Sequence, residues 1–173
     1  MFKHILVPTD GSEPSSNALD LAAGLAKTCG SRLSLVHAIH GDIPIESLRQ
    51  VAERYGFIDQ VEDDLANPDV VMPVATPATG VPIIVVPEPL LQKIGELLLE
   101  KLSEDVRSRG LANVATRLLN GDPADEILAY ADEAGVDLIV TGSRGLGGLK
   151  SLFLGSVSRR LVENATVPCL VVK

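Results

Sequence analysis

Five short apolar runs constrain the fold of this chain more than any other feature of its sequence. Each is bounded by Gly, Pro or Asp, and three contain an unbroken apolar triplet, Ile-Leu-Val, Leu-Ile-Val or Leu-Val-Val. A strand that is buried on both faces needs such two-sided apolar character, whereas an antiparallel strand with one wet face would alternate more strictly. We therefore predict buried parallel strands at residues 4–10, 31–39, 113–119, 136–142 and 167–172.

Stretches with helical periodicity separate these runs. Candidate N-caps Ser12 and Asp122 open two of them, and Gly30, Gly110 and Gly135 close three. Helices are expected over residues 12–30, 89–109 and 122–135 and from about residue 155 onward. The residues expected on their buried faces are Ala18, Leu21, Ala22, Leu25, Ala26, Leu91, Ile94, Leu98, Leu102, Ile127, Leu128, Ala131, Val157, Leu161 and Val162. Strands that alternate with helices predict an open doubly wound five-stranded parallel sheet, an α/β fold with helices on both faces.

Residues 41–88, after the second strand, form an insertion. A fold in which strands simply alternate with helices does not require it. They comprise a possible helix at 45–56, an acidic stretch at 59–69 and an uncharged Pro-rich segment at 70–87. Because long structureless loops are uncommon in compact domains, we expect a subdomain or flap within a single domain of residues 1–173. A solvated insertion without function is the alternative. The four prolines of the apolar segment argue against a transmembrane helix.

The charge of the chain narrows the classes of partner. A formal net charge of -8, with a pI near 4.8, disfavours binding to nucleic acid phosphates. The two cysteines, Cys29 and Cys169, lie far apart and suggest neither a disulfide framework nor a zinc site, and the three histidines show no metal spacing. The first apolar run is too short for a signal peptide, so a cytoplasmic protein is expected.

The glycine-rich segment at 140–162 is the strongest functional signal. Backbone N–H groups of a glycine-rich turn, followed by a helix N-terminus, form an anion site. Glycines are expected there because side chains would block close approach and because such turns need positive φ. A Walker A loop is excluded, since Leu149 stands where its second glycine would be, and a dinucleotide fingerprint fails because Lys150 takes the place of its third glycine. The segment instead matches G-x2-G-x9-G-S, with Gly142, Gly145, Gly155 and Ser156 in register.

This pattern resembles that of the universal stress protein family, in its ATP-binding branch. The resemblance extends to ILVPTDGS at 5–12, SLVHAI at 34–39, GDPADEIL at 121–128, DLIVTGSRG at 137–145 and VENATVPCLVV at 162–172. It implies an adenine nucleotide alpha-hydrolase-like sheet with the nucleotide bound across its carboxyl edge. Within that family the glycine motif closes around the phosphates and the ribose.

The resemblance also implies roles for single residues. Asp10, with Pro8 and Thr9, would line the adenosine end and accept hydrogen bonds from ribose hydroxyls or the adenine amino group, and Val36 would meet the adenine through its backbone. The segment that would approach the ribose and phosphates consists of Gly142, Ser143, Arg144, Gly145, Gly155, Ser156, Val157 and Ser158. Lys150 could add charge. The sequence also allows other roles: Asp10 as a helix cap, Val36 as an ordinary core residue, and Arg159 and Arg160 as surface residues.

The function expected from these features is that of an ATP-binding stress-response regulatory protein without efficient turnover. AMP or ADP are alternative ligands, and Mg or Mn would be held mainly by the phosphates. A slow ATPase or phosphotransferase using the same pocket and a nucleotide-free interaction scaffold are the competing hypotheses. The terminal apolar strand suggests an exposed sheet edge, and both this edge and the resemblance predict a homodimer.

Overall fold

The predicted sheet is confirmed in the computed structural model, which describes residues 1–39, 44–67, 73–75, 82–84, 86–146 and 154–173. Five parallel strands pair in the order β5-β2-β1-β6-β7. Their bounds are β1 His4–Pro8, β2 Arg32–Ile39, β5 Val114–Asn120, β6 Leu138–Gly142 and β7 Cys169–Val172. The strands that carry the apolar triplets are β1, β6 and β7, and β1 and β6 are buried along their whole length.

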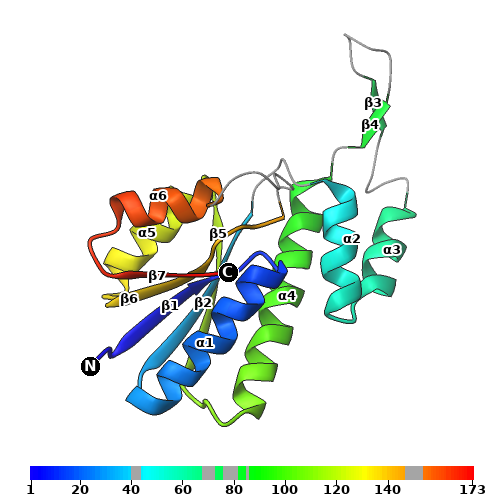
Figure 1. Cartoon of the computed structure of the whole chain (residues 1–173). Coiled ribbons are helices and arrows are strands. Elements are labelled where there is room, and N and C mark those ends of the chain that lie inside the picture. The colour runs from blue at the N-terminus through cyan, green and yellow to red at the C-terminus, as the bar shows by residue number, and fades with distance from the viewer. Residues whose placement is uncertain (40–43, 68–72, 76–81, 85, 147–153) are drawn as a thin grey trace.

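Helices cover both faces of this sheet (Figure 1). Helices α1 (Glu13–Cys29) and α4 (Glu88–Ser108) pack on one face, where alternate strand residues such as Ile5, Val7 and Leu35 point. Helices α5 (Pro123–Glu133) and α6 (Ser156–Asn164) pack on the other face, against Leu6 and Ile139. The sheet is thus the middle of three layers, and its carboxyl edge is formed by loops from both sides.

The predicted caps are confirmed. Ser12 accepts a hydrogen bond from the Ser15 N–H and caps α1, and Asp122 accepts from the Ala124 and Asp125 N–H groups and caps α5. Gly30 ends α1 in the left-handed region, with φ 69°. These local signals fix where two of the helices begin at the carboxyl edge.

Two predicted core positions were wrong. Leu21 is 42% exposed and Val162 is 48% exposed, whereas Leu19 and Ala23 lie in the core. The buried residues of α1 are Ser15, Ala18, Leu19, Ala22, Ala23 and Ala26, so the centre of its buried face lies on the Ala23 side of Ala22. Because each residue turns the helix by about 100°, Leu21 falls on the other side of Ala22, away from this face.

The described part of the insertion contains two helices and two short paired strands. Helix α2 (Ile45–Arg54) occupies the predicted helical segment, and α3 (Ile58–Leu65) occupies the acidic stretch, where no helix was predicted. Strands β3 (Pro73–Ala75) and β4 (Pro82–Ile84) pair antiparallel. The core beside α1 and α4 includes insertion residues Leu48, Val51, Ala52, Phe57 and Val61. The segment from Leu48 to Val61 is therefore packed into the core, whereas the alternative interpretation expected a solvated insertion.

The insertion also reaches the loop that follows β1. Gly11 has φ 79°, and a Cβ atom there would lie 2.7 Å from Cγ1 of Val51 in α2. Glycine is required at this position by both its backbone conformation and the proximity of α2. Within the described ranges, no helix combines the length and apolar character needed to cross a membrane.

Candidate functional site at the carboxyl edge

Strands β1 and β6 are neighbours, and the chain leaves them in opposite directions (Figure 1). After β1 the chain passes to β2 on one side, and after β6 it passes to β7 on the other. Such a switch point leaves a crevice between diverging loops at the carboxyl ends of the strands, where open α/β sheets bind ligands. The loops here are Thr9–Ser12 and Ser143–Leu146, which contain five of the predicted site residues: Thr9, Asp10, Ser143, Arg144 and Gly145.

Asp10 joins these two loops. Its Oδ1 accepts a hydrogen bond from the Ser12 N–H at 3.0 Å, and its Oδ2 accepts one from the Leu146 N–H at 2.9 Å. The Ser12 hydroxyl adds a second link by donating to the Arg144 carbonyl at 3.4 Å. Since Ser12 supplies the side-chain cap of α1, the alternative role of Asp10 as that cap is wrong. Asp10 instead fixes the spacing across the switch point.

Thr9 is held by its neighbours on β2. Its N–H donates to the Val36 carbonyl and its carbonyl accepts from Nδ1 of His37, both at 2.8 Å. Its hydroxyl accepts from the Gly11 N–H at 3.3 Å. Val36 is fully buried and lies in the core beside α5 and α6, and Pro8 ends β1 opposite it. The turn that carries Asp10 is therefore anchored to the sheet.

The motif glycines allow close packing of the site loops. Positive φ angles were also expected for them, but they do not adopt these angles. Gly142, Gly145 and Gly155 all lie outside the positive-φ region, so that part of the expectation was wrong. A Cβ atom on Gly142 would lie 2.6–2.8 Å from backbone atoms of Pro14 and Ser15, at the start of α1. A Cβ atom on Gly145 would overlap Oδ2 of Asp10. Both glycines thus let the site loops approach one another.

The N-terminus of α6 has open hydrogen-bond donors. Gly155 occupies the N-cap position and offers no side-chain acceptor, whereas α1 and α5 are capped by Ser12 and Asp122. The Ser143 carbonyl accepts from the Gly155 N–H at 2.8 Å and from the Ser158 hydroxyl at 3.0 Å, which ties α6 to the loop after β6. In the described part of the chain, the N–H groups of Ser156, Val157 and Ser158 have no acceptor.

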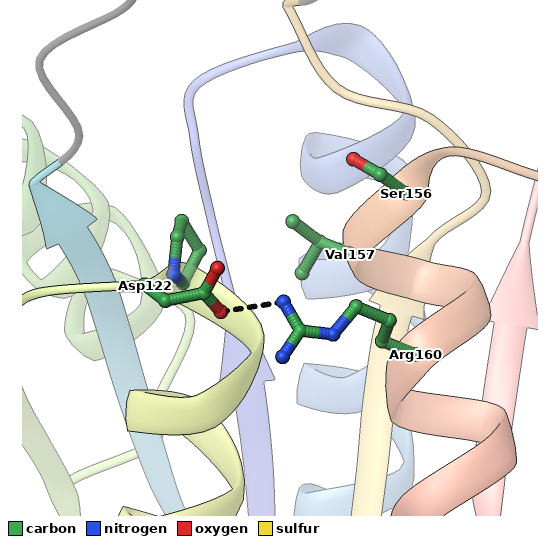
Figure 2. A pocket seen from close by; sticks show the side chains of 5 residues that line it. Asp122, Ser156, Val157 and Arg160 are labelled. Carbon is green, nitrogen blue, oxygen red and sulfur yellow. Dashed lines mark hydrogen bonds and ion pairs between the residues drawn. The ribbon is translucent and has the colours of Figure 1, made fainter.

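A pocket of about 200 Å³ lies between the first turns of α5 and α6 (Figure 2). It is lined by Asp122, Pro123, Ser156, Val157 and Arg160. Arg160 forms an ion pair with Asp122, 2.7 Å between Nη1 and Oδ1, and a second one with Asp125. Ser156 and Val157 were predicted as site residues, but Asp122 was predicted only as a helix cap and Arg160 only as a surface residue. The segment GDPADEIL was the available signal for this side of the pocket.

The structure describes some, but not all, of the other predicted groups. The Arg144 side chain is exposed and forms no ion pair with any described residue. Lys150 lies outside the described residues. Within the described ranges no three His, Cys, Asp or Glu side chains lie close enough together to hold a metal ion. Cys29 and Cys169 are both free thiols.

Histidine burial predicts a pH-dependent stability. Burial lowers the pKa of His37, opposed by its bond to Thr9 and by Asp10, and burial followed by the charge of Arg32 lowers the pKa of His4. The unfolded chain therefore binds more protons below pH 6.5, so stability is complete above that value and declines as the pH falls toward the folded pKa values. Each histidine can contribute at most about 1.4 kcal/mol per pH unit.

The measurement is urea unfolding at pH 7 and pH 5.5 for the wild type and for His37→Asn, whose amide can still donate to the Thr9 carbonyl. We expect a smaller loss of unfolding free energy in the variant. An equal loss in both proteins would show that His37 does not contribute.

A model of the universal stress protein family matches residues 1–55 and 68–173. The chain belongs to the universal stress protein family. It is 34% identical to Universal stress protein YxiE of Bacillus subtilis over 177 aligned residues, which cover the whole of both chains. The family model leaves residues 56–67 unmatched, a segment that contains α3.

Solved structures agree with the fold of this universal stress protein. The structure of protein MJ0577, from Methanocaldococcus jannaschii, superposes with a TM-score of 0.63 at 26% identity and covers 100% of this chain and 96% of that one. A universal stress protein of Archaeoglobus fulgidus, solved in complex with dAMP, has a TM-score of 0.59 at 20% identity, with coverage of 99% and 98%.

Proposed function

We propose that this universal stress protein binds an adenine nucleotide across the switch point between β1 and β6. The nucleotide is ATP, or alternatively ADP or AMP. The observation that carries the proposal is the set of open N–H groups at residues 156–158, at the carboxyl edge of the sheet. Helix N-termini of this kind favour phosphate through their free donors and the helix dipole. The dAMP complex of the Archaeoglobus fulgidus relative supports a nucleotide as the ligand.

The adenosine end of the ligand would lie toward β1 and β2. Each Asp10 oxygen accepts one backbone N–H and retains acceptor capacity for ribose hydroxyls or the adenine amino group. Pro8, Thr9 and the backbone of Val36 form the adjoining wall. Gly142, Ser143, Arg144 and Gly145 connect this end to the α6 N–H groups that would bind the phosphates. The guanidinium of Arg144, which forms no ion pair with a described residue, adds positive charge.

We propose a regulatory role without efficient turnover. Asp10 bridges two backbone N–H groups, which suits a recognition group better than a base that must receive a proton. Mg or Mn would be held mainly by the nucleotide phosphates and would neutralise part of their charge. We also propose that the protein works in the cytoplasm and as a homodimer. Strand β7 forms an edge of the sheet, and Leu170 on it is 37% exposed, which favours pairing with a second copy.

The test begins with freshly purified protein, heated to release its ligand, and mass spectrometry of the supernatant. Calorimetry with ATP and Mg then compares the wild type with Gly155→Val. A Cβ atom at residue 155 makes only ordinary contacts, at 3.5–3.6 Å, so the variant should fold while its side chain crowds the phosphate site. We expect binding at least roughly tenfold weaker, equivalent to about 1.4 kcal/mol.

The matched control is Gly24→Ala, a glycine on α1 with open space around it. This variant should bind as the wild type does. Absence of nucleotide from the extract together with no calorimetric binding would refute the proposal and favour the scaffold hypothesis. Phosphate release above that of Gly155→Val would instead favour the slow ATPase.

A further inference from the structure

We infer that His37 is a positioning residue of the nucleotide site. It holds the peptide group between Thr9 and Asp10 in place for the adenosine end of the ligand, and Gly95 of α4 makes room for its ring. His37 acts through Asp10 and does not itself contact the ligand. The inference rests on the proposed nucleotide binding, because it concerns the same site.

Both backbone groups of Thr9 are held by β2. Its N–H donates to the Val36 carbonyl, and Nδ1 of His37 donates to its carbonyl, each at 2.8 Å. That carbonyl belongs to the planar peptide group that joins Thr9 to Asp10. With both groups fixed, the backbone of Thr9 has little freedom, and this fixes where the Cα atom of Asp10 lies. His37 is the only side chain in this pair of bonds, so the position of Asp10 depends on it.

The His37 ring has the right protonation state for this bond. A carbonyl oxygen can only accept, so Nδ1 carries the proton. Burial lowers the pKa of His37, opposed by the hydrogen bond to Thr9 and by the charge of Asp10, and the ring is therefore neutral at pH 7. His37 is 8% exposed and Thr9 is 6% exposed, so water does not readily replace the bond between them.

Gly95 lies inside α4 and faces the His37 ring. A Cβ atom at this glycine would lie 2.8 Å from Cδ2 of His37 and 2.7 Å from Cδ1 of Leu118. The Leu118 methyl group can move by rotation of its side chain, whereas the ring is held by its bond to Thr9. Glycine weakens a helix interior relative to alanine. The close approach of the ring accounts for a glycine at this position.

Helix α4 also contacts the turn directly. Leu98 lies three residues after Gly95, on the same side of α4, and its Cδ2 is 3.4 Å from where a Cβ atom on Gly11 would lie. Contacts from α4 therefore reach the chain on both sides of Asp10, at Thr9 through His37 and at Gly11 through Leu98. The N–H groups of α6 belong to a helix on the other face of the sheet, so a change at His37 should spare them.

The experiment measures ATP and inorganic tripolyphosphate by competition against a fluorescent ATP analogue at pH 7. His37→Leu keeps an apolar side chain but has no donor, so ATP should bind roughly tenfold more weakly. Tripolyphosphate has no adenosine and should bind within about twofold of the wild type. His37→Asn places an amide donor where Nδ1 stands, and its ATP affinity should return to within about threefold of the wild type. A role in stability alone would weaken both ligands alike.

Gly95→Ala tests the same positioning with the histidine intact. The added methyl group displaces the ring, so ATP should bind about three- to tenfold more weakly, with tripolyphosphate unchanged. Gly24→Ala is the matched control, since it also replaces a glycine inside a helix but has open space around it. This control should bind both ligands as the wild type does.

Three results would overturn the inference. In the first, folded His37→Leu binds ATP as tightly as the wild type or loses both ligands equally. In the second, His37→Asn binds ATP as weakly as His37→Leu. In the third, which decides the case if His37→Leu does not fold, Gly95→Ala binds ATP as tightly as Gly24→Ala. Failure of the wild type to bind ATP, ADP or AMP would overturn the proposed function itself, so the two failures are distinguishable.

Discussion

Replacing Phe57 by alanine is expected to lower the free energy of unfolding by about 3–5 kcal/mol, the usual range for a buried phenylalanine. Phe57 lies between α2 and α3, is 1% exposed and belongs to the core beside α1 and α4. Its backbone also closes the turn, since its N–H donates to the Ala52 carbonyl at 2.8 Å. Removing the ring leaves a cavity where the insertion joins the sheet layers. Urea unfolding measures the change.

The control is Phe57→Leu, which keeps most of the apolar volume and should cost less than about 1.5 kcal/mol. If the insertion were a solvated excursion, Phe57→Ala and Phe57→Leu would both leave stability unchanged. That result would contradict the packing described for residues 45–65.

Replacing Gly142 by alanine is expected to cost at least about 3 kcal/mol, at the upper end of the overpacking range. The added methyl group would lie 2.6 Å from the Pro14 carbonyl carbon and 2.7 Å from the Ser15 nitrogen. These are backbone atoms of the first turn of α1, so no side-chain rotation relieves the contact. The start of α1 and the end of β6 must move apart, which also disturbs the loops of the site. Thermal and urea unfolding report the loss.

Gly24→Ala is the matched control, and it should change the free energy of unfolding in the opposite direction. Gly24 lies within α1 and a Cβ atom there has open space, so alanine should stabilise the protein by about 0.5–1 kcal/mol. Equal effects of the two substitutions would contradict the close approach of α1 to Gly142.

The parts of the fold that could be predicted are those encoded by neighbouring residues. Apolar runs predicted every strand of the parallel sheet, and Ser12 and Asp122 predicted their caps, because both signals act within a few residues. Helix α3 was missed because its apolar residues, Ile58, Val61 and Leu65, are surrounded by carboxylates that read as a solvated stretch. Their burial depends on α2 and α4, which the local sequence does not describe.

The candidate site shows the same division. Motif spacing predicted the loop after β6 and the start of α6, but the pairing of Arg160 with Asp122 joins residues 38 positions apart. No spacing rule connects them, because their contact depends on how α5 and α6 pack on the sheet. Gly142 was predicted as a ligand-approach residue, and its contact with Pro14 became visible only from the position of α1.

The double attachment of Asp10 has a consequence for the entropy of binding. A flexible loop that becomes ordered around a ligand loses conformational freedom at that moment, and the affinity falls accordingly. Here the Thr9–Ser12 turn is fixed in advance by Asp10, by the Val36 carbonyl and by the contact of Gly11 with Val51. The turn therefore loses its conformational entropy when the protein folds and not when a ligand binds. A ligand that enters the crevice meets a turn that is already rigid.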